Sequence, residues 1–211
     1  TGIRKIKIIS HGVEIDRNYF PKKNTEKNLK FVFFSKIHKS KNLLTLIKLW
    51  ENSFFLKKFY LYILGEIDDE IYFSKINELI IRNKNIKYLG SLNKQIQKKL
   101  SKYDVFIHPS KSENFGLVIY EALSSGLFLI LNKNLKKNDL KKNSFAMNIN
   151  FNLRSLNNSI KKISQNKKRI KSLTYKKKSL EYVKNNFNWE IISNYYLKEY
   201  SNITKNNPFK I

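Results

Sequence analysis

The chain has 211 residues, and its 42 Lys and Arg against 16 Asp and Glu give a formal net charge of +26. Hydrophobic residues make up 41% of the sequence, which is enough for a folded core and excludes a wholly disordered chain. The absence of cysteine excludes disulfide scaffolds, thiolate metal sites and cysteine nucleophiles.

Short apolar strands alternate with amphipathic helices along the first two thirds of the chain. The expected strands are 29–35, 59–64, 86–89, 104–108 and 127–131, and the expected helices are 43–50, 70–81, 93–101 and 117–125. This alternation predicts an α/β fold with a doubly wound, mostly parallel, Rossmann-like sheet. Ligands of such sheets bind beyond the carboxyl ends of the strands, in the loops that follow them.

The pattern loosens after residue 132. We expect a polar loop over 133–143 and a further strand over 145–149. Helices are expected over 155–163, 171–185 and 189–200. The sequence shows no internal repeat.

The positive charge is spread along the whole chain, and it comes almost entirely from lysine. This distribution favours a compositional bias on solvated faces over a dedicated binding surface. An anionic membrane surface is the second interpretation. Specific recognition of nucleic acid is the third interpretation. Proteins that recognise base sequence usually use bidentate hydrogen bonds from arginine, whereas the positive charge here comes almost entirely from lysine.

Common cofactor motifs are absent from the sequence. It contains no G-x-G-x-x-G, no P-loop and no H-E-x-x-H, so it predicts neither a dinucleotide fingerprint nor a zinc protease site. The three histidines, His11, His38 and His108, are too scattered to predict a metal site.

The informative segment follows the fourth strand. There a loop leads into a helix that begins near Gly116, and the amides of its first turn can bind an anion. Glu121 lies about 6 Å further along the helix axis than Leu117, where its carboxylate can accept bonds from a ribose diol. Glu113, on the loop, would face whatever is attached beyond the phosphates. The alternative, a loop glutamate and a surface glutamate without a common role, is disfavoured by the ordered motif around them.

These residues resemble a known family. The run PSKSENFGLV at 109–118, followed by EAL at 121–123, is similar to the P-S-x-x-E-x-F-G-L … E-A pattern of retaining glycosyltransferases of family four, which have the GT-B fold. Glu113 through Glu121 resembles the E-x7-E signature of that family. The loop 35–42 is similar to its G/S-R-x-x-x-x-K-G/N phosphate loop.

Weaker similarities extend over about residues 8–200. The segments 63–65 and 88–90 lie where the family has its two x-x-G loops. The segment 9–13 resembles the family's P-N-G-V run, and Trp189 followed by Tyr200 resembles its closing helix.

The resemblance implies a clamp for the donor diphosphate. Lys36 and Lys41 stand where the family has an Arg and a Lys, and the backbone of Gly116 and Leu117 completes the clamp. Lysine at position 36 keeps the charge but loses the bidentate fork, so donor affinity is expected to be weaker than with arginine.

The resemblance also implies how the rest of the donor is held. Glu113 is the catalytic residue, which holds the donor sugar and supports the developing positive charge. The backbone of Asn114 and Phe115 contacts the same sugar, and Glu121 binds the ribose. The base lies near three residues of the x-x-G loops, namely Gly65, Leu89 and Gly90.

The implied reaction is transfer of a sugar, with retention, from a nucleotide-diphosphate sugar to a glycan or lipid-linked acceptor. No metal and no other cofactor is implied. The implied setting is the synthesis of surface polysaccharide or lipopolysaccharide, in the cytoplasm or on the inner face of the membrane.

The resemblance further implies three regions: a linker over 1–28, a donor-binding domain over 29–187 and a cross-over helix with a tail over 188–211. The acceptor lobe of a GT-B enzyme is not expected in this chain and would come in cis or in trans. Alone, the chain is expected to bind donor but to transfer poorly. Two alternatives remain open: a noncatalytic basic adaptor on anionic membrane or nucleic acid, and an inert lobe without nucleotide affinity.

Overall fold

Six parallel strands form one sheet in a computed structural model that describes residues 8–92 and 94–205. The order across the sheet is β3-β2-β1-β4-β5-β6. The strands are β1 (Lys30–Phe34), β2 (Tyr60–Leu64), β3 (Ile86–Tyr88), β4 (Val105–His108), β5 (Phe128–Asn132) and β6 (Ala146–Ile149). The predicted α/β, doubly wound fold is therefore confirmed.

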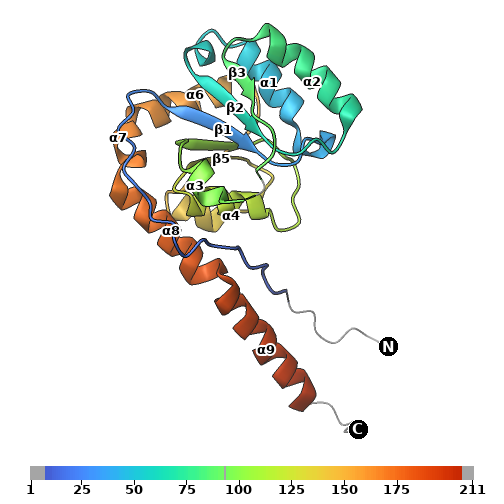
Figure 1. The fold of residues 1–211 in the computed structure, drawn as a ribbon, viewed down its shortest axis with the longest axis vertical. Helices are drawn as coiled ribbons and strands as arrows, with labels where there is room; N and C mark the ends of the chain where they lie inside the picture. Colours follow the sequence, from blue (N-terminus) through green and yellow to red (C-terminus); the bar gives the residue numbers. More distant parts are fainter. Residues whose placement is uncertain (1–7, 93, 206–211) are drawn as a thin grey trace.

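Helices cover both faces of the sheet (Figure 1). Figure 1 shows α1 (Leu43–Glu51) and α2 (Glu70–Arg82) on one side and α3 (Ile96–Leu100), α4 (Leu117–Ser124) and α8 (Leu173–Phe187) on the other. The remaining helices are α5 (Asn138–Lys142), α6 (Leu153–Gln165), α7 (Lys167–Ile170), α9 (Trp189–Lys205) and the 3₁₀ turns η1 (Lys39–Lys41) and η2 (Leu56–Lys58). None of the helices in the described ranges has the length and apolarity that crossing a membrane requires.

The central strands are buried on both faces, which explains why they read as uninterrupted apolar runs. Every residue of β4 and β5 is buried, and Phe31, Val32 and Phe33 of β1 are fully inaccessible. Trp50 of α1 packs against Phe31 at 5.5 Å between ring centroids. Burial of this apolar surface is the main source of the fold's stability.

Several predicted boundaries were wrong, and one helix was missed. The segment 133–143, expected to be a loop, contains the short helix α5, which is anchored by the fully buried Leu140. The helix expected over 171–185 begins two residues later, because the Ser172 side chain accepts from Tyr175 N and caps α8. Asn152 caps α6 in the same way, so that helix begins before the expected residue 155. The start of the helix expected over 93–101 lies outside the described residues, and within them α3 begins at Ile96.

The described part of the predicted linker, residues 8–28, lies on the α3–α4 side of the body. Val13 N donates to Phe187 O at 2.7 Å, which joins this segment to the junction of α8 and α9. The buried Tyr19 donates its hydroxyl to Ser125 O at 3.0 Å. Residues 1–7 of the predicted linker and 206–211 of the predicted tail lie outside the described residues.

Buried charge lies at the amino-terminal edge of the sheet. Asp104, directly before β4, is fully buried and accepts from Asn24 Nδ2 at 2.8 Å and from Lys30 N at 2.9 Å. The buried Lys171 lies 3.2 Å from the second Asp104 oxygen and donates to two backbone carbonyls, at Glu26 and Asn28. We call these residues the Asp104 cluster, and they attach the segment before β1 to the sheet and to the turn between α7 and α8.

Candidate functional site

Two loops meet at the carboxyl edge of the sheet because β1 and β4 are neighbours. The loop 35–42 follows β1, and the loop 109–116 follows β4. The buried Ser110 hydroxyl donates to Ser40 O at 3.3 Å, and Asn42 Nδ2 donates to Pro109 O at 3.3 Å. These bonds fix the two loops side by side, as the position of ligands in parallel sheets predicts.

The joined loops bring Lys41, Glu113 and His108 into one cluster, which we call the Glu113 cluster. Lys41 Nζ lies 2.8 Å from Glu113 Oε1 and 2.9 Å from Oε2. His108 Nε2 lies 2.8 Å from the same Oε1. Two of these residues were predicted site residues, whereas His108 was not.

The charge state of the Glu113 cluster follows from its surroundings. Burial by itself raises the pKa of Glu113, but the hydrogen bonds from His108 and Lys41 outweigh burial and lower the pKa to about 2. Burial lowers the pKa of His108 below its ordinary value, despite its bond to Glu113. At neutral pH the cluster therefore holds a carboxylate, an ammonium and a neutral imidazole.

Helix α4 begins beside this cluster at Gly116, which has φ +76° and is the cap of the helix. This left-handed conformation favours glycine. No side chain of the described residues caps the helix, and its first turn contains no acidic residue, so the amides of that turn have no carboxylate partner there. With Lys41 nearby, this end of α4 has the charge and the donors that a phosphate requires.

Lys137 holds the same loop from the other side, although no sequence pattern predicts this contact. Its Nζ donates to Phe115 O at 2.8 Å and to the Tyr120 hydroxyl at 3.1 Å. It also lies over both aromatic rings, at 5.0 and 4.8 Å from their centroids. Asn114 is exposed beside it. No local pattern could identify Lys137, because it lies in a segment predicted to be a loop.

Lys36 is exposed at the end of β1 and forms an ion pair with Asp68 at 3.3 Å. A backbone bridge between Ile37 and Ile67 joins the loops that carry the two residues. Lys36 therefore lies at the carboxyl edge of the sheet but has a different partner from Lys41. Its role in binding a diphosphate stays a prediction.

The residues predicted to lie near a base come together at the ends of β2 and β3. Gly65 N donates to Gly90 O at 2.9 Å, and the Leu89 side chain beside them is half exposed. A Cβ at Gly65 would lie 1.8 Å from Ser35 O, so this position requires glycine. The hydrogen bond between Gly65 and Gly90 thus joins the two loops into one surface, which we call the shelf, next to the loop that carries Lys36.

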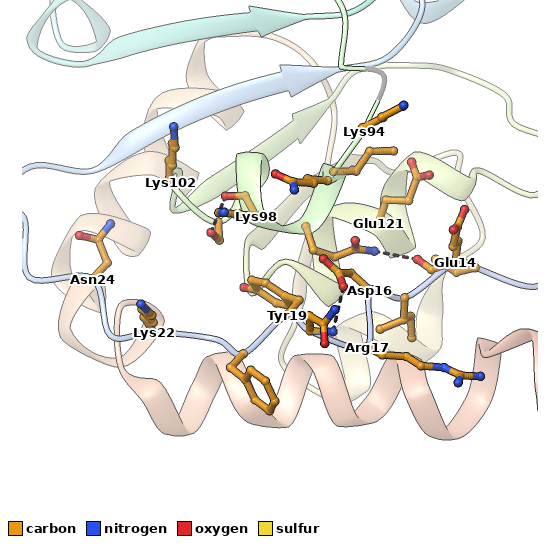
Figure 2. A pocket seen from close by; sticks show the side chains of 18 of the residues that line it. Glu14, Asp16, Arg17, Tyr19, Lys22, Asn24, Lys94, Lys98, Lys102 and Glu121 are labelled. Carbon is orange, nitrogen blue, oxygen red and sulfur yellow. Dashed lines mark hydrogen bonds between the residues drawn. The ribbon is translucent and has the colours of Figure 1, made fainter.

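Glu121 lines a cavity of about 1390 Å³ on the α3–α4 side, together with residues 13–20, 22–26 and 94–98 among others. Figure 2 shows Glu121, Glu14 and Lys94 around one end of this cavity and Lys22 and Lys102 at the other. Burial raises the pKa of Glu121, and the nearby charge of Glu14 raises it further. Glu121 and Glu113 thus flank the start of α4 and share no partner among the described residues.

Replacing Glu121 with glutamine is expected to raise the melting temperature at pH 7. A carboxyl group whose pKa is raised by folding destabilises the folded state as the pH rises above its ordinary value, 4.5, and through the folded pKa. The gain from Glu121→Gln should therefore shrink as the pH is lowered through the folded pKa toward 4.5, and it should be absent below 4.5. Thermal denaturation of both proteins at several pH values measures this difference, and a gain that is the same at every pH would contradict the assignment.

Metal ligands do not gather in the parts of the chain that the structure describes. No group of three or more His, Asp or Glu side chains there is arranged to hold a metal ion. Lys41 and Lys36 are two cations at the carboxyl edge that could hold an anionic ligand.

A model of the protein family described as glycosyl transferases group 1 matches residues 15–180 of the chain. This match includes both the Glu113 cluster and Glu121. A search among curated proteins found no match.

Solved structures of glycosyltransferases resemble the chain in fold. Anabaena HepE in complex with UDP and glucose has a TM-score of 0.67 at 20% identity, over 83% of this chain and 48% of that one. Sucrose-phosphate synthase from Thermosynechococcus elongatus has a TM-score of 0.70 at 19% identity, over 85% and 47%. WaaG, a glycosyltransferase involved in lipopolysaccharide biosynthesis, has 0.69 at 15%, over 92% and 56%. The chain spans about half the length of these structures.

Proposed function

Because the chain belongs to the family of glycosyl transferases group 1, we propose that it is the donor-binding half of a GT-B enzyme that transfers a sugar, with retention, from a nucleotide-diphosphate sugar. The Glu113 cluster at the uncapped start of α4 carries the proposal. There an ammonium, a carboxylate and the first-turn amides of a helix lie at the carboxyl edge of a parallel sheet.

The diphosphate binds between the first-turn amides of α4 and Lys41, with Lys36 at its outer side. Charge-assisted hydrogen bonds to phosphate contribute roughly 1.5–3 kcal/mol each, more than the roughly 0.3–1 kcal/mol of a helix dipole. The same cations stabilise the negative charge that develops on the leaving nucleoside diphosphate. Lys41, which is bound to Glu113 in this structure, turns toward the phosphates when they arrive.

The two carboxylates have different tasks. Glu113 faces the donor sugar and supports the positive charge that develops at its anomeric carbon. Glu121 accepts bonds from the ribose at the end of the cavity next to Lys94. The base lies on the shelf formed by Gly65 and Gly90, where contacts to backbone predominate.

Wild-type protein titrated with UDP and with UDP-glucose in a calorimeter tests this proposal. Glu121→Gln should weaken both ligands several-fold, because both contain the ribose. Glu181→Gln, an exposed glutamate of α8, is the matched control and should change neither. Failure of both ligands to bind would reject a uridine-nucleotide site, and equal behaviour of the two variants would reject the role of Glu121.

The same wild-type and variant proteins distinguish a nucleotide-sugar site from the alternative function, a noncatalytic basic adaptor. Binding of duplex DNA or of phosphatidylglycerol vesicles by such an adaptor would fall steeply with salt and would not respond to changes at Glu113 or Glu121. A nucleotide-sugar site predicts the opposite dependence on these two residues.

The similarity in fold to WaaG supports a glycan or lipid-linked acceptor and a setting in the synthesis of surface polysaccharide or lipopolysaccharide. We place the reaction in the cytoplasm or on the inner membrane face, without a metal cofactor. Because the chain spans about half of its structural neighbours, the acceptor lobe is expected to be supplied in cis or in trans.

A further inference from the structure

His108 is a buried polar residue whose place in the structure is not explained by packing. Its ring is fully inaccessible at the end of β4 and stacks on Phe106 at 5.4 Å between ring centroids. Its Nδ1 is buried and has no hydrogen-bond partner among the described residues. A buried acceptor without a partner lowers stability, and an apolar side chain would avoid that cost.

The tautomer of His108 follows from its neighbours. Burial keeps the imidazole neutral, and the Glu113 carboxylate can only accept a hydrogen bond. Nε2 must therefore carry the proton and donate it to Glu113 Oε1, so the partnerless Nδ1 is the lone-pair nitrogen.

The two oxygens of Glu113 have different partners. Within the described part of the chain, Oε1 is bound by both His108 and Lys41, whereas Oε2 is bound by Lys41 alone. In the proposed function Lys41 is also the cation that binds the diphosphate. Once Lys41 turns to the phosphates, Oε2 is free, and His108 is the group that still fixes Oε1.

On the basis of the proposed function, we propose that His108 is a positioning residue that holds Glu113 by Oε1 and thereby presents Oε2 to the donor sugar. The buried, stacked ring makes His108 a rigid partner, whereas the lysine side chain is flexible. The unsatisfied Nδ1 is then the cost of keeping a donor at this place in the core.

The test compares two ligands that differ only in the sugar. His108→Leu should weaken UDP-glucose about tenfold or more, as loss of a hydrogen bond to a charged group predicts, and should change UDP less than about twofold. His108→Gln places an amide N–H near the position of Nε2 and should restore most of the affinity for UDP-glucose. If His108→Leu changes the affinities for UDP-glucose and UDP by the same factor, the positioning role of His108 is overturned. That result would not contradict the proposed nucleotide-sugar site.

A second measurement does not depend on any ligand. The carboxyl carbon of Glu113, followed by NMR during an acid titration, should report a pKa near 2 in the wild type, because the bond from His108 helps to lower it. His108→Leu should raise that pKa, and His108→Gln should raise it less. Circular dichroism checks that each variant is folded. An unchanged pKa in folded His108→Leu would overturn the proposal even if UDP did not bind.

Discussion

Replacing Lys41 with alanine is expected to weaken the binding of UDP by roughly 10- to 100-fold, the equivalent of the roughly 1.5–3 kcal/mol that a charge-assisted bond to phosphate contributes. In the proposed site Lys41 is the cation that contacts Glu113, and no other ammonium does so within the described ranges. Calorimetric titration with UDP measures the loss. Lys41→Arg keeps the charge and should lose less affinity.

Lys57→Ala is the matched control for this prediction. Lys57 is exposed on η2, directly before β2 and away from the carboxyl edge of the sheet, and its removal changes the net charge by the same amount. In a chain with a net charge of +26, a general loss of positive potential would weaken UDP in both variants. Equal losses of UDP affinity in Lys41→Ala and Lys57→Ala would therefore contradict a direct contact between Lys41 and the diphosphate.

Replacing Asp104 with alanine is expected to destabilise the fold by about 3–5 kcal/mol, the usual effect of removing one partner of a buried ion pair. The substitution leaves the buried Lys171 ammonium without its carboxylate and removes the acceptor of Asn24 and of Lys30 N. For a chain of this size, such a loss lowers the melting temperature by roughly 2–4 °C per kcal/mol. Urea denaturation measures the free energy of unfolding directly.

Asp68→Ala is the surface counterpart of this substitution. Asp68 forms an exposed pair with Lys36, and exposed pairs contribute roughly 0–1 kcal/mol. Lys171→Met combined with Asp104→Ala should recover part of the loss, because position 171 then no longer carries a buried ammonium without its carboxylate. A loss in Asp104→Ala no greater than in Asp68→Ala would show that the Asp104 cluster contributes little to the fold.

The sheet could be predicted from sequence because strands buried on both faces consist of apolar runs, and the run over 127–131 is an example. Boundaries were less accurate, since they depend on individual caps such as Ser172. Helix α5 was missed because it is five residues long and a single buried leucine, Leu140, anchors it. A segment that short has no periodicity to detect.

The site could be predicted only as far as its loops. Resemblance of the loop 35–42 to a phosphate loop predicted Lys41, and the structure places this loop beside the loop that carries Glu113. The bond from His108 and the anchor provided by Lys137 depend on how side chains pack across the loops, which the motif around Glu113 does not show. The signal for His108 was its position as the last residue of a buried strand, where a polar side chain requires a partner.

Strand β4 connects the two groups of polar residues discussed above. Asp104 stands directly before the strand and His108 is its last residue, so their backbones are about 13 Å apart at about 3.3 Å per residue. Energetic effects at sites so far apart, with no common partner, are generally additive. Substitutions that stabilise the amino-terminal edge of the sheet can therefore compensate for destabilising substitutions in the loops at its carboxyl edge. The stability of the fold and the ligand preference of the loops can then be changed independently.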